Sequence, residues 1–160
     1  MATTNLSLYD SEQTPDASGL KFGIVVSEWN PEITQNLFNG ALSTLKKHGA
    51  LDKDIVAIKV PGSFELIHGC KRLLDAHDFD AIIAIGNVIK GETEHFTFVC
   101  EGVTQGIKDL NIKYDTPTIF CVLTDHNKQQ SIDRSGGKHG NKGIECAVAA
   151  IKMGVLNSQL

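Results

Sequence analysis

Residues 81–95 read AIIAIGNVIKGETEH, a segment that passes from a strand through a loop into a helix. The apolar run that stops at Gly86 is typical of a buried strand. Gly91 lets backbone amides approach a ligand closely, and Thr93 stands where a helix is expected to begin, so an anion can bind there. His95 follows within a few residues, and histidine transfers protons near neutral pH. The segment therefore indicates a buried strand that leads into a site for a small phosphorylated substrate.

The same residues also fit an ordinary turn into a helix that binds no ligand. Glycine and threonine cap many such helices, and a lone histidine is more often structural than catalytic. The ends of the other strands are needed to choose between these two interpretations.

Strands and helices alternate along the chain. Apolar runs predict strands at residues 21–26, 55–60, 79–85 and 118–123. The remaining segments predict helices over residues 31–48, 64–77, 93–110, 128–135 and 143–156. Continuous apolar strands that alternate with helices indicate a four-stranded parallel sheet with helices on both faces, a three-layer α/β/α sandwich of the flavodoxin-like type. We expect residues 1–19 to form an N-terminal arm, either loose or paired with a sheet edge, and residues 20–160 to form a single domain.

Composition and charge exclude several classes of function. The net charge is −4 with no basic stripe, which argues against a nucleic-acid partner, and no apolar run is long enough to span a membrane. The first nineteen residues contain neither Lys nor Arg and no apolar signal core, so we expect no secretory peptide and a cytoplasmic location. The cysteines are far apart and form no C-x-x-C pair, which favours free thiols over disulfides or zinc ligands: Cys70, Cys100, Cys121 and Cys146.

Polar and aromatic residues gather after the predicted strands. In parallel sheets, ligands bind outside the carboxyl ends of the strands. The residues found there are Trp29, the 61–65 segment PGSFE, the Asn87–His95 segment, and the cations Arg134, Lys138 and Lys142. An aromatic ring, a carboxylate, an anion-binding segment, a histidine and cations form a coherent set for a phosphorylated substrate. Neither a Walker lysine motif nor G-x-G-x-x-G is present, which disfavours nucleotide hydrolysis and dinucleotide binding.

Several glycines fall inside the predicted helices: Gly40, Gly69, Gly102 and Gly106. Glycine there costs roughly 0.5–1 kcal/mol relative to alanine, so a close backbone contact is expected to compensate. That contact can lie within the chain, against the sheet, or between subunits, and the sequence leaves both alternatives open.

Linked motifs occur in a fixed order from residue 21 to residue 156. They are GIVV at 23–26 followed by Trp29-Asn30, VPGSFEL at 60–66, G-x-VIKG-x-T-x-HF at 86–96, and R-x-G-x-K-x-GNKG at 134–143. With these motifs the chain resembles the lumazine synthase family of riboflavin biosynthesis. The resemblance implies an enzyme that joins 5-amino-6-(D-ribitylamino)uracil to 3,4-dihydroxy-2-butanone 4-phosphate without a metal or organic cofactor. The alternative is a flavin or lumazine carrier on the same scaffold, but a carrier needs neither the proton transfer of His95 nor the phosphate contacts of Thr93 and Arg134.

The resemblance also implies individual roles. The residues expected to bind the ribitylaminouracil are Trp29, Ser63, Phe64, Glu65, Asn87, Val88, Ile89 and, from a neighbouring subunit, Phe120. Those expected to hold the butanone phosphate are Glu92, Thr93 and Arg134, with Lys138 and Lys142 as supporting cations, and His95 is expected to transfer protons. The implied assembly is a homopentamer, with decamers and icosahedral shells as alternatives, and riboflavin synthase is a candidate partner.

The sequence departs from the family pattern at several places, among them the Thr124-Asp125-His126-Asn127 turn, where Thr-Thr-Glu-Asn is more common. Trp29 replaces the usual phenylalanine, and Asn87 stands where threonine is common. Glu92 stands where a small residue is usual, and a carboxylate beside a phosphate is unfavourable. We therefore expect the backbone amide of Glu92 to make the contact while its side chain turns away.

Overall fold

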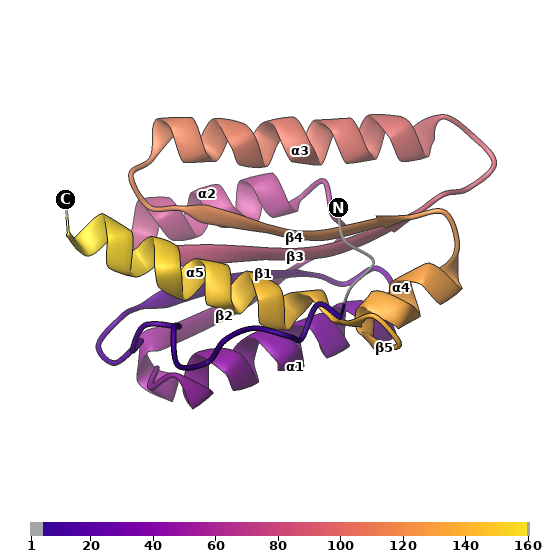
Figure 1. The fold of residues 1–160 in the computed structure, drawn as a ribbon. Coiled ribbons are helices and arrows are strands. Elements are labelled where there is room, and N and C mark those ends of the chain that lie inside the picture. Colours follow the sequence, from indigo (N-terminus) through magenta and orange to yellow (C-terminus); the bar gives the residue numbers. More distant parts are fainter. Residues whose placement is uncertain (1–4, 160) are drawn as a thin grey trace.

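A four-stranded parallel sheet forms the centre of the molecule, as Figure 1 shows. The computed structural model describes residues 5–159. The strands are β1 (Phe22–Ser27), β2 (Ile55–Val60), β3 (Ala81–Ile89) and β4 (Thr118–Asp125), in the order β2-β1-β3-β4. After β2 the chain returns to the other side of β1 to add β3. The carboxyl ends of β1 and β3 therefore flank the point at which the strand order reverses.

Helices cover both faces of the sheet, so the predicted three-layer sandwich is confirmed. Helices α1 (Pro31–Lys47) and α5 (Lys142–Ser158) cover one face, and α2 (Leu66–Ala76) and α3 (His95–Lys113) cover the other (Figure 1). The short helix α4 (Lys128–Arg134) follows β4. It leads into a hairpin of β5 (Ser135–Gly137) and β6 (Gly140–Asn141), and a 3-10 turn at Asp52–Asp54 precedes β2.

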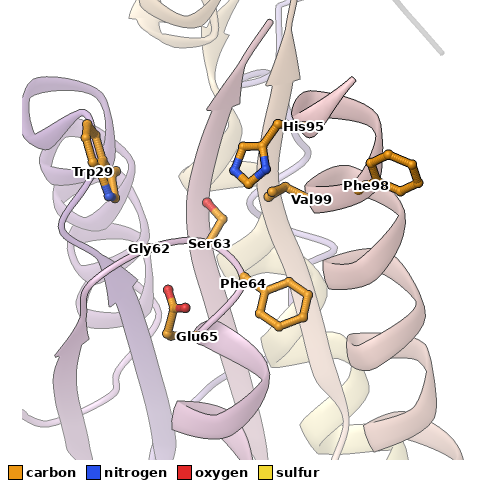
Figure 2. A pocket seen from close by; sticks show the side chains of 8 residues that line it. All are labelled: Trp29, Gly62, Ser63, Phe64, Glu65, His95, Phe98 and Val99. Carbon is orange, nitrogen blue, oxygen red and sulfur yellow. The ribbon is translucent and has the colours of Figure 1, made fainter. Parts of the chain in front are cut away.

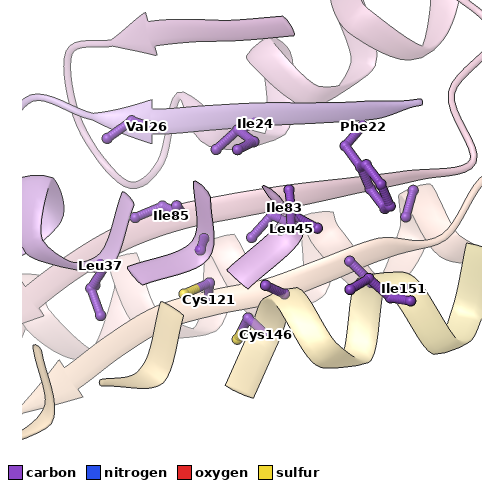
Figure 3. Close-up of a cluster of buried hydrophobic side chains, with 14 of the residues drawn as sticks. Phe22, Ile24, Val26, Leu37, Leu45, Ile83, Ile85, Cys121, Cys146 and Ile151 are labelled. Atoms are coloured by element: carbon purple, nitrogen blue, oxygen red, sulfur yellow. The ribbon is translucent and has the colours of Figure 1, made fainter. Parts of the chain in front are cut away.

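The larger core lies between the sheet and helices α1 and α5 (Figure 3). Alternate residues of β1 point into it, namely Phe22, Ile24 and Val26, and Val25 points into the second core on the opposite face. All six residues of β1 are buried, which explains why its sequence reads as one continuous apolar run. Each large aliphatic side chain buried in this way contributes about 1.5–3 kcal/mol to folding.

Strand β3 is longer than the sequence indicated. The prediction ended it at Ile85, but pairing with β4 continues from Gly86 opposite Val122 to Ile89 opposite Asp125. A Cβ at Gly86 would lie 2.6 Å from Ser63 Oγ, so the glycine makes room for the segment after β2 and does not end the strand. Asn87, Val88 and Ile89 consequently lie on the rigid end of a strand and not in a loop.

Helix α3 also starts later than expected. It begins at His95, whereas the prediction began it at Thr93. Thr93 therefore precedes the helix, and its Oγ1 accepts a long hydrogen bond of 3.4 Å from the amide of His95. At the other helices the predicted starts are close, and Asn127 caps α4 by accepting from the amide of Gln130 at 3.0 Å.

Packing within the chain accounts for the glycines inside the helices. A Cβ would lie 2.7 Å from Asn141 at Gly40, 2.7 Å from Val25 at Gly69 and 2.7 Å from the Phe64 ring at Gly102, and Gly106 is in equally close contact with Ile67. The close contacts thus lie within the chain, but only Gly69 packs against the sheet as expected, and the other three glycines pack against the hairpin, a loop or another helix.

The N-terminal segment follows α1 and does not pair with a sheet edge. Within residues 5–20 no strand is formed, and residues 1–4 of the predicted arm lie outside the described part. The amide of Leu6 donates to the carbonyl of His139 at 2.7 Å, and Ser7 Oγ accepts from the amide of Asn141 at 2.9 Å. Tyr9 contacts His48 at the far end of α1, where its hydroxyl lies 3.1 Å from Nε2. The described part of the arm is therefore held at the β5–β6 hairpin and at the C-terminal end of α1.

The cysteines are free thiols, as predicted. Cys70, Cys121 and Cys146 are buried and Cys100 is half-buried. Burial raises the pKa of Cys70 to about 12, so its thiol stays protonated. No helix in the described part of the chain is both long and apolar enough to cross a membrane.

Candidate active site

A groove opens at the carboxyl ends of β1, β2 and β3. One part of it, with a volume of about 500 Å³, is lined by Trp29, Gly62, Ser63, Phe64, Glu65, His95, Phe98 and Val99 (Figure 2). An adjoining part of about 370 Å³ is lined by Trp29, Asn30, Ser63, Asn87, Val88, Ile89, His95 and Val99. Trp29, Ser63 and His95 border both parts, so we treat them as one groove. It lies where ligands bind in open α/β sheets.

The segment after β1 supplies the first wall. Trp29 is 71% exposed, so one broad aromatic surface faces solvent. The next residue, Asn30, has a left-handed backbone with φ 54°, and it is the one non-glycine residue with positive φ among residues 5–159. Asn30 occupies the N-cap of α1 as predicted, but its side chain makes no capping bond. The side-chain Nδ2 of Asn30 donates to Asn87 Oδ1 instead, at 2.9 Å, and this bond ties the wall to the end of β3.

The segment after β2 supplies the floor. Ser63 is buried, and its hydroxyl donates to the carbonyl of Asn87 at 3.3 Å. Gly62 lies against both Glu65 and Trp29, because a Cβ there would be 2.8 Å from Glu65 Oε2 and 3.3 Å from Trp29 Cδ1. In Figure 2 the carboxylate of Glu65 and the hydroxyl of Ser63 point into the groove. A hydroxylated ligand could thus meet an acceptor and a hydroxyl side by side.

The first turns of α3 supply the opposite wall. The imidazole of His95 points into the groove, while the Phe98 ring points outward (Figure 2). Phe98 is 69% exposed, and Phe64 packs against Gly102 of the same helix. Phe98 and Val99 were missed by sequence reasoning, although their spacing of three and four residues from His95 places them on its side of the helix.

The other predicted site residues lie outside this groove. Glu92 and Thr93 are exposed in the segment before α3, and Phe120 packs against the second core from β4. Arg134 ends α4, where its Nη1 donates to the carbonyl of Gln130 at 3.2 Å and lies 3.9 Å from Asp125 Oδ1. A single chain therefore brings together the residues expected to bind the uracil, apart from Phe120. The residues expected to hold the phosphate lie outside the groove.

The supporting cations each have an acidic partner. Lys138 Nζ lies 3.2 Å from Asp133 Oδ2. Lys142 forms an ion pair with Glu145 in the first turn of α5. Burial is the largest single influence on the pKa of Lys142 and lowers it, but the hydrogen bond with Glu145 and the electrostatic attraction of Glu145, Cys146 and Cys121 together outweigh burial, so this pKa is raised. Neither lysine borders the groove of its own chain.

The arrangement suits a flat, polar heterocycle that carries hydroxyl groups. The exposed indole of Trp29 can stack on such a ring. Glu65 and Ser63 can bind hydroxyls, and the end of β3 presents backbone groups to the ring edge. His95 stands at the junction of both parts of the groove, where an imidazole can move protons to and from a bound substrate.

Comparison with a family model and with known proteins points to the same family in each case. The family described as 6,7-dimethyl-8-ribityllumazine synthase matches residues 19–158. A protein of that name from Flavobacterium psychrophilum is 60% identical over 158 residues, which cover 99% of this chain and 84% of the relative. One from Christiangramia forsetii is 60% identical over 98% of this chain and 95% of the relative. One from Parabacteroides distasonis is 56% identical over 96% of this chain and 97% of the relative.

Proposed function

The chain belongs to the 6,7-dimethyl-8-ribityllumazine synthase family, and we propose that its reaction takes place in the groove at the carboxyl end of the sheet. The protein is a transferase of riboflavin biosynthesis. It condenses 5-amino-6-(D-ribitylamino)uracil with 3,4-dihydroxy-2-butanone 4-phosphate to 6,7-dimethyl-8-ribityllumazine, phosphate and water. The carrier alternative has no support from the relatives, which bear the name of a synthase.

The observation that carries the proposed site is the meeting of Trp29, Glu65 and His95 around one groove. Trp29 stacks on the pyrimidine ring, and Glu65 accepts hydrogen bonds from the ribityl hydroxyls. Val88 and Ile89 line the adjoining part and meet the uracil edge through their backbone groups. Asn87 also acts there through its backbone, because its side-chain oxygen and nitrogen are already bonded to Asn30 and Ser131.

His95 serves the proton transfers of the reaction. The 5-amino group attacks the ketone, and the adduct loses water to give an imine. Phosphate then leaves as the adjacent carbon gives up a proton, and the resulting enol takes up a proton and becomes a ketone. The ribitylamino nitrogen attacks this ketone and closes the ring with loss of water. Each stage moves a proton, and a positioned imidazole typically contributes about 10²- to 10⁴-fold to such steps. Holding both reactants in one groove supplies much of the remaining acceleration.

The phosphate contacts come from Arg134, Thr93 and the backbone of Glu92. Arg134 carries a fixed positive charge, and the guanidinium geometry suits bidentate contact with phosphate. Asp125 lies 3.9 Å from Arg134 Nη1, which is beyond hydrogen-bond distance, so it attracts the guanidinium without occupying its donors.

We also propose that the site is completed by assembly into a homopentamer. Large apolar side chains are exposed around the groove and along α3: Trp29, Phe64, Phe98 and Ile112 at 71%, 53%, 69% and 76%. Trp29, Phe64 and Phe98 all line the groove, and an exposed apolar patch of this kind is typical of a protein interface. Phe120 lies outside the groove of its own chain, which supports its contribution to the site of a neighbouring subunit. Sedimentation velocity distinguishes a pentamer from a decamer or a shell.

Mixed oligomers test whether the site is shared. We expect His95→Ala and Phe120→Ala oligomers each to be strongly impaired, and oligomers co-refolded from both to recover activity. Some interfaces of the mixture pair an intact His95 with an intact Phe120 from the neighbour. Each variant refolded alone is the control. If mixing is verified by mass spectrometry and no activity returns, each site is built within a single chain.

Trp29 provides a direct test of ligand stacking, because it is the one tryptophan of the sequence. Riboflavin or the lumazine product should quench its emission in a saturable and stoichiometric manner. Trp29→Phe should keep most of the activity, since a phenyl ring still stacks. Trp29→Ala should lose about 0.5–1.5 kcal/mol of binding beyond the lost contact area, measured by titrating the ligand's own fluorescence. Tryptophan emission that is unchanged at saturating ligand would place Trp29 outside the site.

A further inference from the structure

A buried chain of hydrogen bonds runs from the Trp29 wall of the groove to the helix that carries Arg134. Asn30 Nδ2 donates to Asn87 Oδ1 at 2.9 Å, and Asn87 Nδ2 donates to Ser131 Oγ at 2.9 Å. Ser131 Oγ in turn donates to Asp125 Oδ2 at 2.8 Å. The other carboxylate oxygen of Asp125 is the one that lies 3.9 Å from Arg134 Nη1. These links join residues that are up to 57 positions apart in the sequence.

Each hydrogen bond of this series has a fixed donor and a fixed acceptor. Asp125, as a carboxylate, can only accept, so the hydroxyl proton of Ser131 is committed to it. Ser131 Oγ can then only accept from Asn87, which orients the amide of Asn87 and turns its oxygen toward Asn30. If the Asn87 amide were flipped, its NH2 group would face the NH2 group of Asn30. The bonds therefore hold Asn87 in one orientation.

Water does not compete with the central hydrogen bonds of this series. Ser131 is 0% exposed, Asn87 3% and Asp125 6%. A buried carboxylate without a partner is costly, and aligned hydrogen bonds in a poorly solvated interior strengthen one another. This series of hydrogen bonds therefore acts as a stiff connection between β3, β4 and α4.

Both ends of the connection reach residues that contact substrate in the proposed function, on which this inference rests. At one end Asn30 has the left-handed backbone that follows Trp29, and its side-chain bond to Asn87 holds that conformation. At the other end Ser131 and Arg134 are three residues apart on α4, and Asp125 lies beside both. We propose that Asn87 and Ser131 are positioning residues that set the Trp29 wall and the Arg134 guanidinium relative to each other.

The central test removes the Ser131 hydroxyl in two backgrounds, the parent protein and the Arg134→Ala variant. Ser131→Ala changes no atom on the surface of the groove, since the residue is fully buried. We expect it to raise the KM for the butanone phosphate about three- to tenfold, in the range found for residues that act through a network. In an Arg134→Ala background the same substitution should leave that KM unchanged, because the residue through which it acts is gone.

A second measurement follows the other end of the connection. The Kd for riboflavin, measured by Trp29 emission, should rise in Ser131→Ala and should rise equally in the Arg134→Ala background. Ser135→Ala is the matched control, because Ser135 is also buried, and the one hydrogen bond of its hydroxyl within the described residues goes to the carbonyl of Ile132 near the end of α4. It should change neither the KM nor the Kd, and a thermal melt of each variant records any loss of folded protein.

The possible results separate this inference from the proposed function. If Arg134→Ala by itself leaves the KM for the butanone phosphate unchanged, Arg134 is not a phosphate ligand, and both proposals are wrong. If Arg134→Ala raises that KM but Ser131→Ala multiplies it equally in both backgrounds, only the positioning role is overturned. An effect of Ser135→Ala as large as that of Ser131→Ala would likewise reduce Ser131 to a packing residue. An unchanged Kd for riboflavin would overturn the connection to Trp29.

Discussion

Turnover of the His95→Ala variant at saturating substrates should be about 10- to 10⁴-fold slower than that of the parent enzyme. The imidazole points into the groove, and no other histidine borders either part of it within the described residues. The remaining activity is expected because both reactants are still held together after the proton-transfer group is lost. Product formation, followed by the absorbance of the lumazine, gives the rate directly.

Folding of this variant should be unaffected, because His95 is an exposed residue at the first position of α3. His77→Ala is the matched control, since His77 is also exposed but caps the end of α2 away from the groove. It should retain the parent rate. A His95→Ala enzyme that is as fast as the His77→Ala enzyme would remove the imidazole from the mechanism.

Arg134→Ala should raise the KM for the butanone phosphate about 10- to 100-fold. This is the effect expected when a charge-assisted hydrogen bond worth about 1.5–3 kcal/mol is lost. Inhibition by inorganic phosphate should weaken in parallel, because the same guanidinium would bind the free anion. Affinity for the ribitylaminouracil should change much less. Steady-state kinetics with each substrate varied in turn separates the two effects.

Lys128→Ala is the matched control for the loss of a positive charge. Lys128 lies on the same helix as Arg134, but its ammonium pairs with Glu32 at 3.1 Å and borders neither part of the groove. It should leave both KM values close to those of the parent. Equal losses for both substrates in Arg134→Ala would instead indicate a defect in folding or assembly.

The parts of the fold that the sequence predicted are those that local burial determines. A strand that is buried on both faces must be apolar throughout, so β1 and the first part of β3 could be recognised from composition alone. Residues at the strand ends were then brought together by the topology of parallel sheets, which explains why Trp29, Glu65 and His95 meet.

What the sequence could not predict depends on partners that are distant along the chain. Gly86 looked like the end of a strand, and only its contact with Ser63 shows that it is a packing position inside β3. Asn30 looked like a capping residue, yet its amide is bonded to Asn87, 57 positions away. Neither contact leaves a periodic trace in the sequence, because hydrogen bonds between elements follow from tertiary packing and not from local propensity.

The course of the N-terminal arm has a practical consequence for attaching foreign groups to this protein. Leu6 and Ser7 of the arm are hydrogen-bonded to the β5–β6 hairpin, which directly follows Arg134 in the chain. Helix α5 runs from that hairpin to the opposite end of the sandwich (Figure 1). A dye, an affinity handle or a display antigen joined behind α5 is therefore carried away from the groove, whereas one attached at Leu6 or Ser7 lies on the side of the hairpin that follows Arg134, the proposed phosphate ligand.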